Sequence, residues 1–257
     1  MYLRLRQIAL VARDLELAER SLTAAFDTQV CYRDPGVAKY GLHNALWALG
    51  GTFLEVVAPT QDGTAAGRYL DRRKGDGGYM LILDCDDLDA RRAHLTSRSV
   101  RLVEDLKVGN ETLAAEALHL HPRDTGGCLL SIDRHGPDTG LMGSYRWAGA
   151  DWHGKARRDV SINGATMQCN DAAETATRWG DLLNRAPHAT PDGGFEFALD
   201  NARIRFAPLA DDRGEGLTRV SLACVNRSTV LASAHASHAE TDAEGFRACG
   251  VHFAVGQ

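Results

Sequence analysis

An acidic side chain stands inside an apolar, strand-like run in the first quarter of the chain. Glu55 is the one charged residue between Phe53 and Ala58. A carboxylate buried among apolar side chains must be paired, hydrogen-bonded or protonated, because an isolated buried charge is costly. Burial also raises the pKa of a carboxylic acid, which suits the group for proton transfer near neutral pH. Glu55 is therefore predicted to be a general base toward an acidic C–H, with a structural, hydrogen-bonded carboxylate as the alternative.

Imidazole and carboxylate side chains follow in other strand-like runs. His119 and His121 are separated by one residue, so on a strand both project from one face and can serve a metal or line a cleft. The alternative is a pair of solvated or backbone-bonded imidazoles. Asp133 shares a strand face with Ser131 for the same reason. It is expected either to supply a carboxylate to the site or to form a salt bridge with Arg134 at the strand's end.

A repeated strand–helix pattern must position these side chains. Residues 7–15 and 80–88 each run from a short apolar strand into Asp-Leu, and a helical stretch follows each of them. An aspartate at a helix N-cap satisfies orphan amide groups at the point where the strand ends. Each helix is then followed by about three short strands, with a hairpin turn at Gly50-Gly51 in the first repeat. The second half of the chain repeats this plan more faintly from residues 165–183 onward.

The composition is that of a folded globular protein. The chain has 257 residues and a formal net charge of −5, with 44% hydrophobic and 25% charged residues. These values exclude the disordered, collagen-like and disulfide-scaffold classes, and the mild acidity argues against nucleic acid as a main partner. No apolar run approaches the roughly 18 residues of a membrane span. Nucleotide-binding glycine motifs and the Gly-x-Ser-x-Gly elbow of serine hydrolases are absent.

The cysteines and the N-terminal residues predict a cytoplasmic protein. The 6 cysteines are widely spaced and include no Cys-x-x-Cys pair, so they are expected to be reduced and mostly buried. The first residues mix charged and apolar side chains and lack the continuous apolar core of a signal peptide.

The stretch Gly41–Leu46, followed by Phe53–Pro59, resembles the glyoxalase-like branch of the vicinal oxygen chelate superfamily. That superfamily contains glyoxalases, bleomycin-resistance proteins and extradiol dioxygenases. The resemblance implies an α+β fold in which four βαβββ units form two curved-sheet barrels. Residues 1–135 are then the N-terminal glyoxalase-like domain with the candidate site, 136–156 a linker, and 157–257 a degenerate C-terminal domain.

Enzymes of this superfamily hold one divalent metal on the concave face of the sheet. The metal chelates two neighbouring oxygens of the substrate and acts as a Lewis acid. The resemblance places the four ligand positions at Gln7, Glu55, Met80 and Ser131. Gln7 and Glu55 supply oxygen ligands for Zn, Ni, Co, Mn or Fe, whereas a thioether and a hydroxyl are poor ligands for such ions. The sequence thus predicts a metal site with half of its ligands, and Met80 is expected in the core or the cleft lining.

Further side chains are predicted to contact the bound molecule. His43 and Asn44 lie in the stretch that carries the resemblance, and His43 is alternatively a hydrogen-bonding residue at a strand entry. Trp47 is expected either to line the cleft or to pack in the core. The full predicted substrate-binding set is His43, Asn44, Trp47, Met80, His121, Ser131 and Asp133.

Two functions follow from the resemblance. In the first, the N-terminal cleft binds a small oxygen-rich or aromatic molecule and isomerises or cleaves it, as a glyoxalase-like lyase or an extradiol-type dioxygenase. In the second, the chain is a metal-free binding protein that sequesters its ligand, as bleomycin-resistance proteins do. The retained Gln7 and Glu55 favour the first function, and the lack of histidine at the ligand positions favours the second. The expected partners are a small molecule and a second copy of the chain, with no nucleic acid and no membrane.

Overall fold

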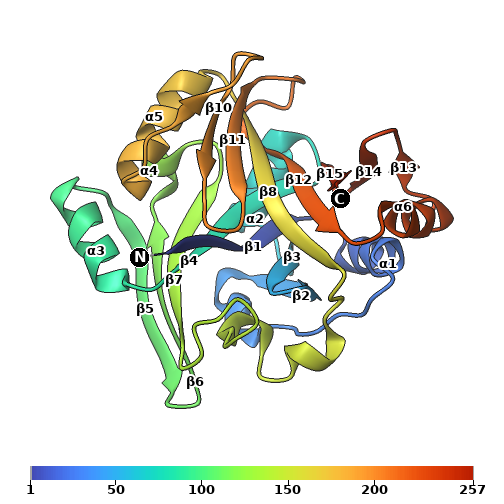
Figure 1. The fold of residues 1–257 in the computed structure, drawn as a ribbon, viewed down its shortest axis with the longest axis horizontal. Helices are drawn as coiled ribbons and strands as arrows, with labels where there is room; N and C mark the ends of the chain where they lie inside the picture. Colours follow the sequence, from blue (N-terminus) through green and yellow to red (C-terminus); the bar gives the residue numbers. More distant parts are fainter. Residues whose placement is uncertain (1, 257) are drawn as a thin grey trace.

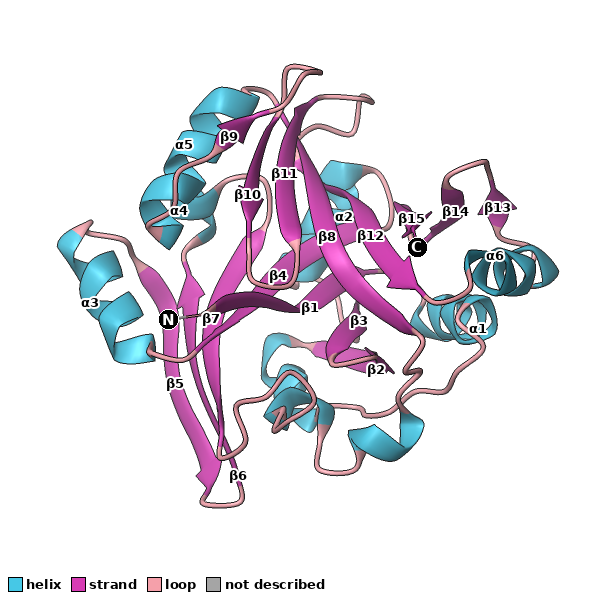
Figure 2. Ribbon diagram, viewed as in Figure 1, coloured by secondary structure: helices cyan, strands magenta, loops and turns pink. Residues whose placement is uncertain are grey.

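The computed structural model describes residues 2–256 and consists of two curved β-sheets with helices around them (Figures 1 and 2). The first sheet contains β1 (Leu3–Val11), β2 (Leu42–Leu49), β3 (Thr52–Pro59), β4 (Gly77–Cys85), β5 (Leu102–Asn110), β6 (Leu113–Leu120) and β7 (Leu129–Gly136). The second contains β8 (Val160–Cys169), β9 (His188–Ala189), β10 (Phe195–Ala198), β11 (Arg203–Pro208), β12 (Gly216–Cys224), β13 (Glu240–Thr241), β14 (Gly245–Ala248) and β15 (Val251–Gly256). The expected α+β fold with two curved sheets is confirmed.

Six α-helices and three short 3-10 helices are found in the described residues. They are α1 (Leu15–Ala25), α2 (Ala65–Arg73), α3 (Leu88–Ser97), α4 (Pro122–Thr125), α5 (Ala172–Leu183) and α6 (Arg227–Ala236), with η1 (Pro35–Tyr40), η2 (Arg146–Ala148) and η3 (Trp152–Lys155). Among residues 2–256, no helix has the length and apolarity needed to cross a membrane.

The strand pairing repeats within and between the sheets. In the first sheet, β1 and β4 are antiparallel neighbours, and each pairs in parallel with the last strand of its own unit, β3 or β7. In the second sheet, β8 and β12 take the same places, with β11 and β15 as their parallel partners. Each sheet is therefore made of two units joined through their first strands.

Acidic and amide N-caps begin the main helices where the sequence predicts them. Asp14 accepts a hydrogen bond from the backbone N–H of Leu17 at 2.9 Å, and Asp87 does the same for Ala90. Asp171 and Asn226 cap the corresponding helices of the second half. The N-cap prediction is confirmed, and it fixes where each first strand ends.

The first unit has fewer returning strands than expected. Only β2 and β3 follow α1 in the sheet, and the stretch before them forms η1 instead of a third strand. Pro35 at the start of η1 cannot donate to a strand ladder, and Gly36 weakens a strand. In place of a third strand, Tyr32 forms a single antiparallel bridge with Leu46 on the edge strand β2.

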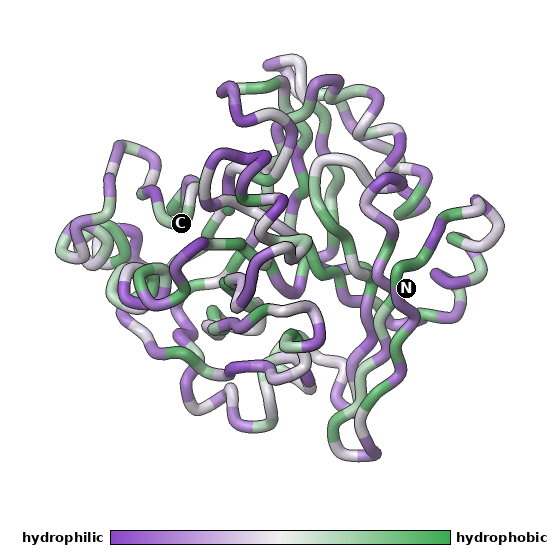
Figure 3. The backbone as a smooth tube through the Cα atoms, turned by 180° about the vertical axis from the view of Figure 1, so that it is seen from behind, coloured by the Kyte–Doolittle hydropathy of each residue, from purple (hydrophilic) through white to green (hydrophobic). Residues whose placement is uncertain are grey.

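The two faces of the first sheet have different surroundings. Ile8, Leu54 and Leu81 lie on the core face, in a hydrophobic cluster shared with the second sheet and with α1 and α6. The opposite face, here called the inner face, carries Gln7 and Glu55. The interior strands are the most hydrophobic parts of the trace, and the outer turns are mostly hydrophilic (Figure 3).

A bulge in β1 changes which side chains reach the inner face. The register with β4 shifts between Leu5 and Gln7, so Arg6 is an extra residue in this ladder. A bulge leaves one residue unpaired and re-aims the neighbouring side chains. Arg4, Arg6 and Gln7 consequently all project toward the inner face.

Residues 137–157, here called the covering segment, fold back across the inner face of the first sheet. The segment runs beneath β2 and β3 in the lower part of Figure 1 and includes η2 and η3. Its Tyr145 and Trp152 are buried in a cluster with Leu46 and Phe53. Most of this stretch was expected to be a linker. The domain boundaries at 135 and 157 stay a prediction.

Packing between the sheets gives a direct test of this arrangement. A Cβ atom added to Gly78 on β4 would lie 2.4 Å from the Leu217 side chain on β12. Gly78→Ala should therefore lower the free energy of unfolding by roughly 1–3 kcal/mol through overpacking. Denaturant titration measures this, with Gly154→Ala as the control because its Cβ would meet nothing within 4 Å. Equal stabilities of the two variants would contradict the sheet contact.

Candidate functional site

Glu55 is held on the inner face by two side-chain amides. Gln7 Nε2 donates to Glu55 Oε2 at 2.7 Å, and Asn44 Nδ2 donates to Glu55 Oε1 at 2.6 Å. The three side chains come from β1, β2 and β3 and have exposed fractions of only 2% for Gln7, 3% for Asn44 and 7% for Glu55. The structure thus brings together the three predicted residues Gln7, Asn44 and Glu55.

The environment of Glu55 raises its pKa. Burial is the main cause, and it raises the pKa from an ordinary value of 4.5 to about 7. The hydrogen bond from Asn44 lowers the pKa, the negative charge of Asp34 raises it, and the hydrogen bond from Gln7 lowers it. No cation is among these neighbours, so burial prevails. Glu55 can therefore both release and accept a proton near neutral pH.

Tyr145 of the covering segment orients Gln7. Its hydroxyl donates to Gln7 Oε1 at 2.7 Å, which leaves the Gln7 Nε2 amide to face Glu55. The Tyr145 ring stacks on Phe53 with 4.2 Å between ring centroids. Burial raises the pKa of Tyr145 well above its ordinary value, so the hydroxyl stays a neutral donor. A chain of two hydrogen bonds therefore connects Tyr145 through Gln7 to Glu55.

A second buried polar group lies on strand β7, which β4 separates from β1. Asp133 accepts hydrogen bonds from the hydroxyl of Ser131 and, at 2.6 Å, from Trp147 Nε1 of the covering segment. His135 Nε2 lies 3.6 Å from the same carboxylate. The alternative salt bridge between Asp133 and Arg134 is not formed, because Arg134 pairs with Glu116 at 3.7 Å.

Three of the predicted residues lie elsewhere. Trp47 projects from the other face of β2 into the shared core, where its Nε1 donates to Thr23 Oγ1 at 3.1 Å. His43 is exposed and, by strand alternation, points away from Asn44. His121 caps α4 and accepts from the backbone N–H of Arg123 at 3.2 Å. These three side chains do not join the group around Glu55.

The donor set on the inner face does not fit a hard divalent metal. Gln7 turns its Nε2 amide, and not its oxygen, toward Glu55, and its Oε1 accepts the Tyr145 hydroxyl. The other two positions hold Met80, half-buried on β4 opposite Ala9, and Ser131, which donates to Asp133. Within residues 2–256, no group of three or more His, Cys, Asp or Glu residues is arranged to hold a metal ion.

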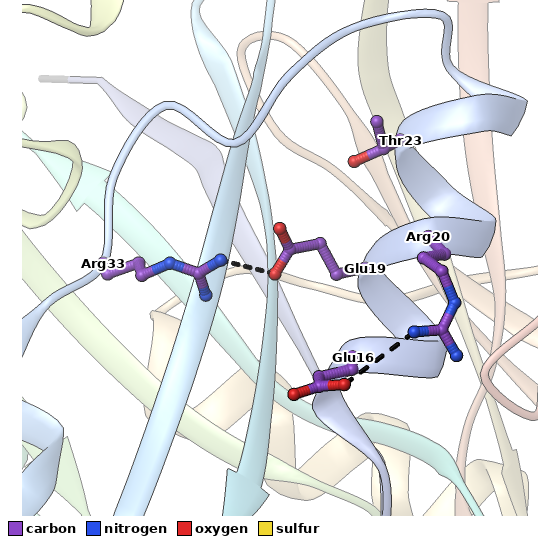
Figure 4. Close-up of a pocket in the computed structure, with 5 residues that line it drawn as sticks. All are labelled: Glu16, Glu19, Arg20, Thr23 and Arg33. Atoms are coloured by element: carbon purple, nitrogen blue, oxygen red, sulfur yellow. Dashed lines mark hydrogen bonds and ion pairs between the residues drawn. The ribbon is translucent and has the colours of Figure 1, made fainter.

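A surface hollow on α1 is a poorer candidate site. It has a volume of about 350 Å³ and is lined by Glu16, Glu19, Arg20, Thr23 and Arg33 (Figure 4). Its charges pair with each other, Arg33 with Glu19 at 2.6 Å and Arg20 with Glu16 at 3.9 Å. Exposed pairs of this kind contribute little to stability or recognition.

Sequence reasoning missed the residues of the inner face that come from irregular structure. Tyr145 and Trp147 lie in the stretch taken as a linker, and Arg6 is aimed inward by a bulge. One signal was available, because the covering segment contains Tyr145, Trp147 and Trp152 within eight positions. A solvated linker rarely carries so many large aromatic side chains.

Comparisons with known proteins match a family model, several relatives and solved structures. Residues 8–183 match a family model described as a glyoxalase-like domain. The chain is 26% identical over 132 residues to human mitochondrial methylmalonyl-CoA epimerase, covering 51% of this chain and 73% of that protein. It is 24% identical over 134 residues to an ethylmalonyl-CoA/methylmalonyl-CoA epimerase of Cereibacter sphaeroides, covering 51% and 97%. A solved hypothetical protein from Staphylococcus aureus shares the fold over 99% of both chains, with a TM-score of 0.71 and 12% identity.

The raised pKa of Glu55 predicts a characteristic dependence of stability on pH. The folded-state pKa of about 7 exceeds the ordinary 4.5, so this group's contribution is fully present below pH 4.5 and is lost as the pH rises through 7. Glu55→Gln cannot ionise and escapes this loss. Its unfolding free energy relative to the natural chain should rise by about 3 kcal/mol between pH 4.5 and 8. Chemical denaturation at both pH values measures the change, with exposed Glu16→Gln as the control. A difference that does not vary with pH would mean that Glu55 ionises normally.

Proposed function

Because this chain belongs to the glyoxalase-like domain family, within the vicinal oxygen chelate superfamily, we propose that the inner face of its first sheet binds a small carbonyl compound. On that compound Glu55 removes a proton from the carbon next to the carbonyl group, a solvent proton is added to the opposite face of that carbon, and Glu55 releases its own proton to solvent. The reaction is an isomerisation with no net gain or loss of protons. The observation that carries this proposal is a buried carboxyl group with a pKa near 7, held by neutral amides alone.

The hydrogen bonds of Glu55 leave room for this step. A carboxylate has about four lone-pair positions, and the bonds from Gln7 and Asn44 use one on each oxygen. A C–H proton can therefore reach a remaining lone pair without displacing either amide. A base with a pKa near the working pH balances the fraction ionised against the strength of the base.

The proposed reaction needs no metal ligand from this chain. The donor set argues for this, since Gln7 and Glu55 are engaged with each other and Met80 and Ser131 are poor ligands for hard ions. The lyase and dioxygenase activities expected from the resemblance require a chelating metal, so they are the less favoured chemistry. A site with Zn, Ni, Co, Mn or Fe stays a prediction of the sequence.

The names of two relatives favour isomerase chemistry. Both are called epimerases of acyl-CoA thioesters, and inverting a centre next to a thioester carbonyl requires a proton to leave and return. The sequence identities of 24–26% over about half of this chain support the class of chemistry and leave the substrate open.

A second function, ligand binding without chemistry, is favoured by the closure of the inner face. Tyr145 and Trp147 cover the polar side chains, and Asp133 and Glu55 are both hydrogen-bonded. A covered polar face of this kind suits a protein that sequesters its ligand, as bleomycin-resistance proteins do. The experiment below separates the two functions.

Exchange of a substrate C–H with solvent deuterium tests the proposed reaction. Methylmalonyl-CoA is incubated with the protein in D2O, and loss of the C2 proton is followed by proton NMR. The natural chain should accelerate this loss, and Glu55→Gln should reduce the acceleration by roughly 10²- to 10⁴-fold, because the general base is gone. The rate should rise with pH and level off above about 7, where Glu55 is ionised.

Glu104→Gln is the matched control for this experiment. Glu104 lies on the same face of the sheet but is half-exposed and paired with Lys39 at 2.8 Å. Its substitution should leave the exchange rate unchanged. If methylmalonyl-CoA raises the melting temperature but exchanges no faster than in buffer, sequestration replaces isomerisation as the function.

A further inference from the structure

Arg6 is a buried cation on the inner face that the proposed reaction does not use. Its exposed fraction is 1%, and the bulge in β1 aims its side chain toward the covering segment. Nη1 donates to the backbone carbonyls of Leu141 and, at 3.4 Å, Gly140. The guanidinium carbon lies 5.0 Å from the centroid of the Tyr145 ring. Arg6 is therefore held in place by one of its three nitrogens and by an aromatic ring.

The other two nitrogens of Arg6 have no partner. Nε and Nη2 are both buried and form no hydrogen bond with the described residues. These two nitrogens lie on one edge of the planar guanidinium, and their N–H groups point in the same direction. That edge matches the two oxygens of a carboxylate, which it can bind through two parallel hydrogen bonds. A buried cation without such partners is costly, so the edge is expected to be occupied in the working protein.

The unpartnered N–H groups on this edge and beside it favour an occupant that accepts hydrogen bonds. The carboxylate of Asp84 is paired with Arg4 through Oδ2, at 2.5 Å from Nη2, and its Oδ1 is buried without a hydrogen-bond partner. Among residues 2–256, no carboxylate forms an ion pair with Arg6. His135 Nδ1 accepts the backbone N–H of Arg146, so Nε2 carries the ring hydrogen, and it too lacks a hydrogen-bond partner. Two nitrogens of Arg6 and one of His135 are therefore left without a hydrogen-bond acceptor.

We propose that Arg6 is the binding site for a carboxylate group of the ligand, engaged through its Nε and Nη2 edge. This inference rests on the proposed function and narrows its substrate class to small carbonyl compounds that also carry a carboxylate. Tyr145 lies between the two groups that would contact such a ligand, Glu55 and Arg6. Its hydroxyl bonds to Gln7, the partner of Glu55, and its ring faces the guanidinium of Arg6. A ligand that reaches both groups must therefore displace Tyr145 from between them.

The covering segment controls access to this site. Its residues 137–140 are exposed, and it contacts the face through the carbonyls of Thr139, Gly140 and Leu141 on Arg4 and Arg6. The Arg4 contact is exposed and the Arg6 contacts are partly buried, and the buried Tyr145 packs in a cluster separate from the shared core, so lifting the segment leaves that core in place. Entry of a carboxylate then requires opening of residues 137–145.

Arg73 provides a matched comparison within the chain. It is also 1% exposed, its Nη1 donates to the carbonyls of residues 213–215, and its Nε and Nη2 lack partners. It lies at the end of α2, beside Tyr69 and Gly216, and not on the inner face with Glu55. If substitution of Arg6 weakens ligand binding and substitution of Arg73 does not, the binding depends on the inner face and is not a general property of buried arginines.

Binding of malonate tests the proposal. Isothermal titration should show that malonate binds the natural chain and that malonamide, its uncharged analogue, does not. Arg6→Lys keeps the charge but loses the planar edge, so it should weaken malonate binding roughly 10- to 100-fold. Arg73→Lys should leave the affinity unchanged. In the natural chain labelled with ¹⁵N-arginine, the Arg6 Nε–H resonance should shift on addition of malonate, a readout that needs no substitution.

Several outcomes would overturn the proposal. Malonate that fails to bind would mean that the free edge holds only water. Equal affinities for the natural chain and Arg6→Lys, or loss of binding in Arg73→Lys, would place the anion elsewhere. Phosphate binding at least as tightly as malonate would contradict the assignment to a carboxylate.

A further variant separates this site from the proposed reaction. Glu55→Gln should keep the malonate affinity of the natural chain, since the Arg6 edge does not use Glu55. If malonate binds as expected but no C–H exchange occurs, the carboxylate site stands and the isomerase function fails. If exchange occurs and malonate does not bind, the isomerase function stands and the Arg6 site fails.

Discussion

The burial of one carboxyl group, that of Glu55, is the constraint on which the rest of the site depends. With no cation among its neighbours, the group keeps its proton to a higher pH than a solvated glutamate does. The amides of Gln7 and Asn44 give it hydrogen bonds without fixing its charge. A charged partner would have locked it as a carboxylate and lowered its pKa. Neutral donors leave it able to change its protonation state, which a general base requires.

The same chain closes its own inner face. In the first sheet the covering segment supplies Tyr145 to Gln7 and Trp147 to Asp133, so side chains far apart in the sequence complete two buried polar groups. In the second sheet the corresponding first strand, β8, is buried except at the half-buried Ser161, Asn163 and Thr166. The duplication of the fold has therefore produced one covered face with a buried acid and a second sheet that contributes mainly to the shared core.

Much of the framework could be predicted from local patterns, and much of the site's surroundings could not. The Asp-Leu junctions mark real N-caps, and Glu55 in its apolar run is buried as expected because its neighbours alternate on a paired strand. The sequence predicts about three strands after the second helix but does not place β5, because its residues are half-buried or exposed and carry several charges. The inward direction of Arg6 depends on a bulge, which shifts the pairing register and leaves no mark in hydrophobic periodicity. The contacts of Tyr145 are long-range, and only the folded chain brings them to Gln7.

Direct titration of Glu55 tests the central claim most directly. The protein is labelled with ¹³C at the glutamate side-chain carboxyl carbons, and the Glu55 resonance is identified by its absence in Glu55→Gln. Its chemical shift followed from pH 3 to pH 9 should give a pKa of about 7, well separated from the exposed glutamates. A midpoint near the ordinary 4.5 would show that the group is charged throughout the neutral range. The account of a buried, proton-exchanging carboxyl group would then be contradicted.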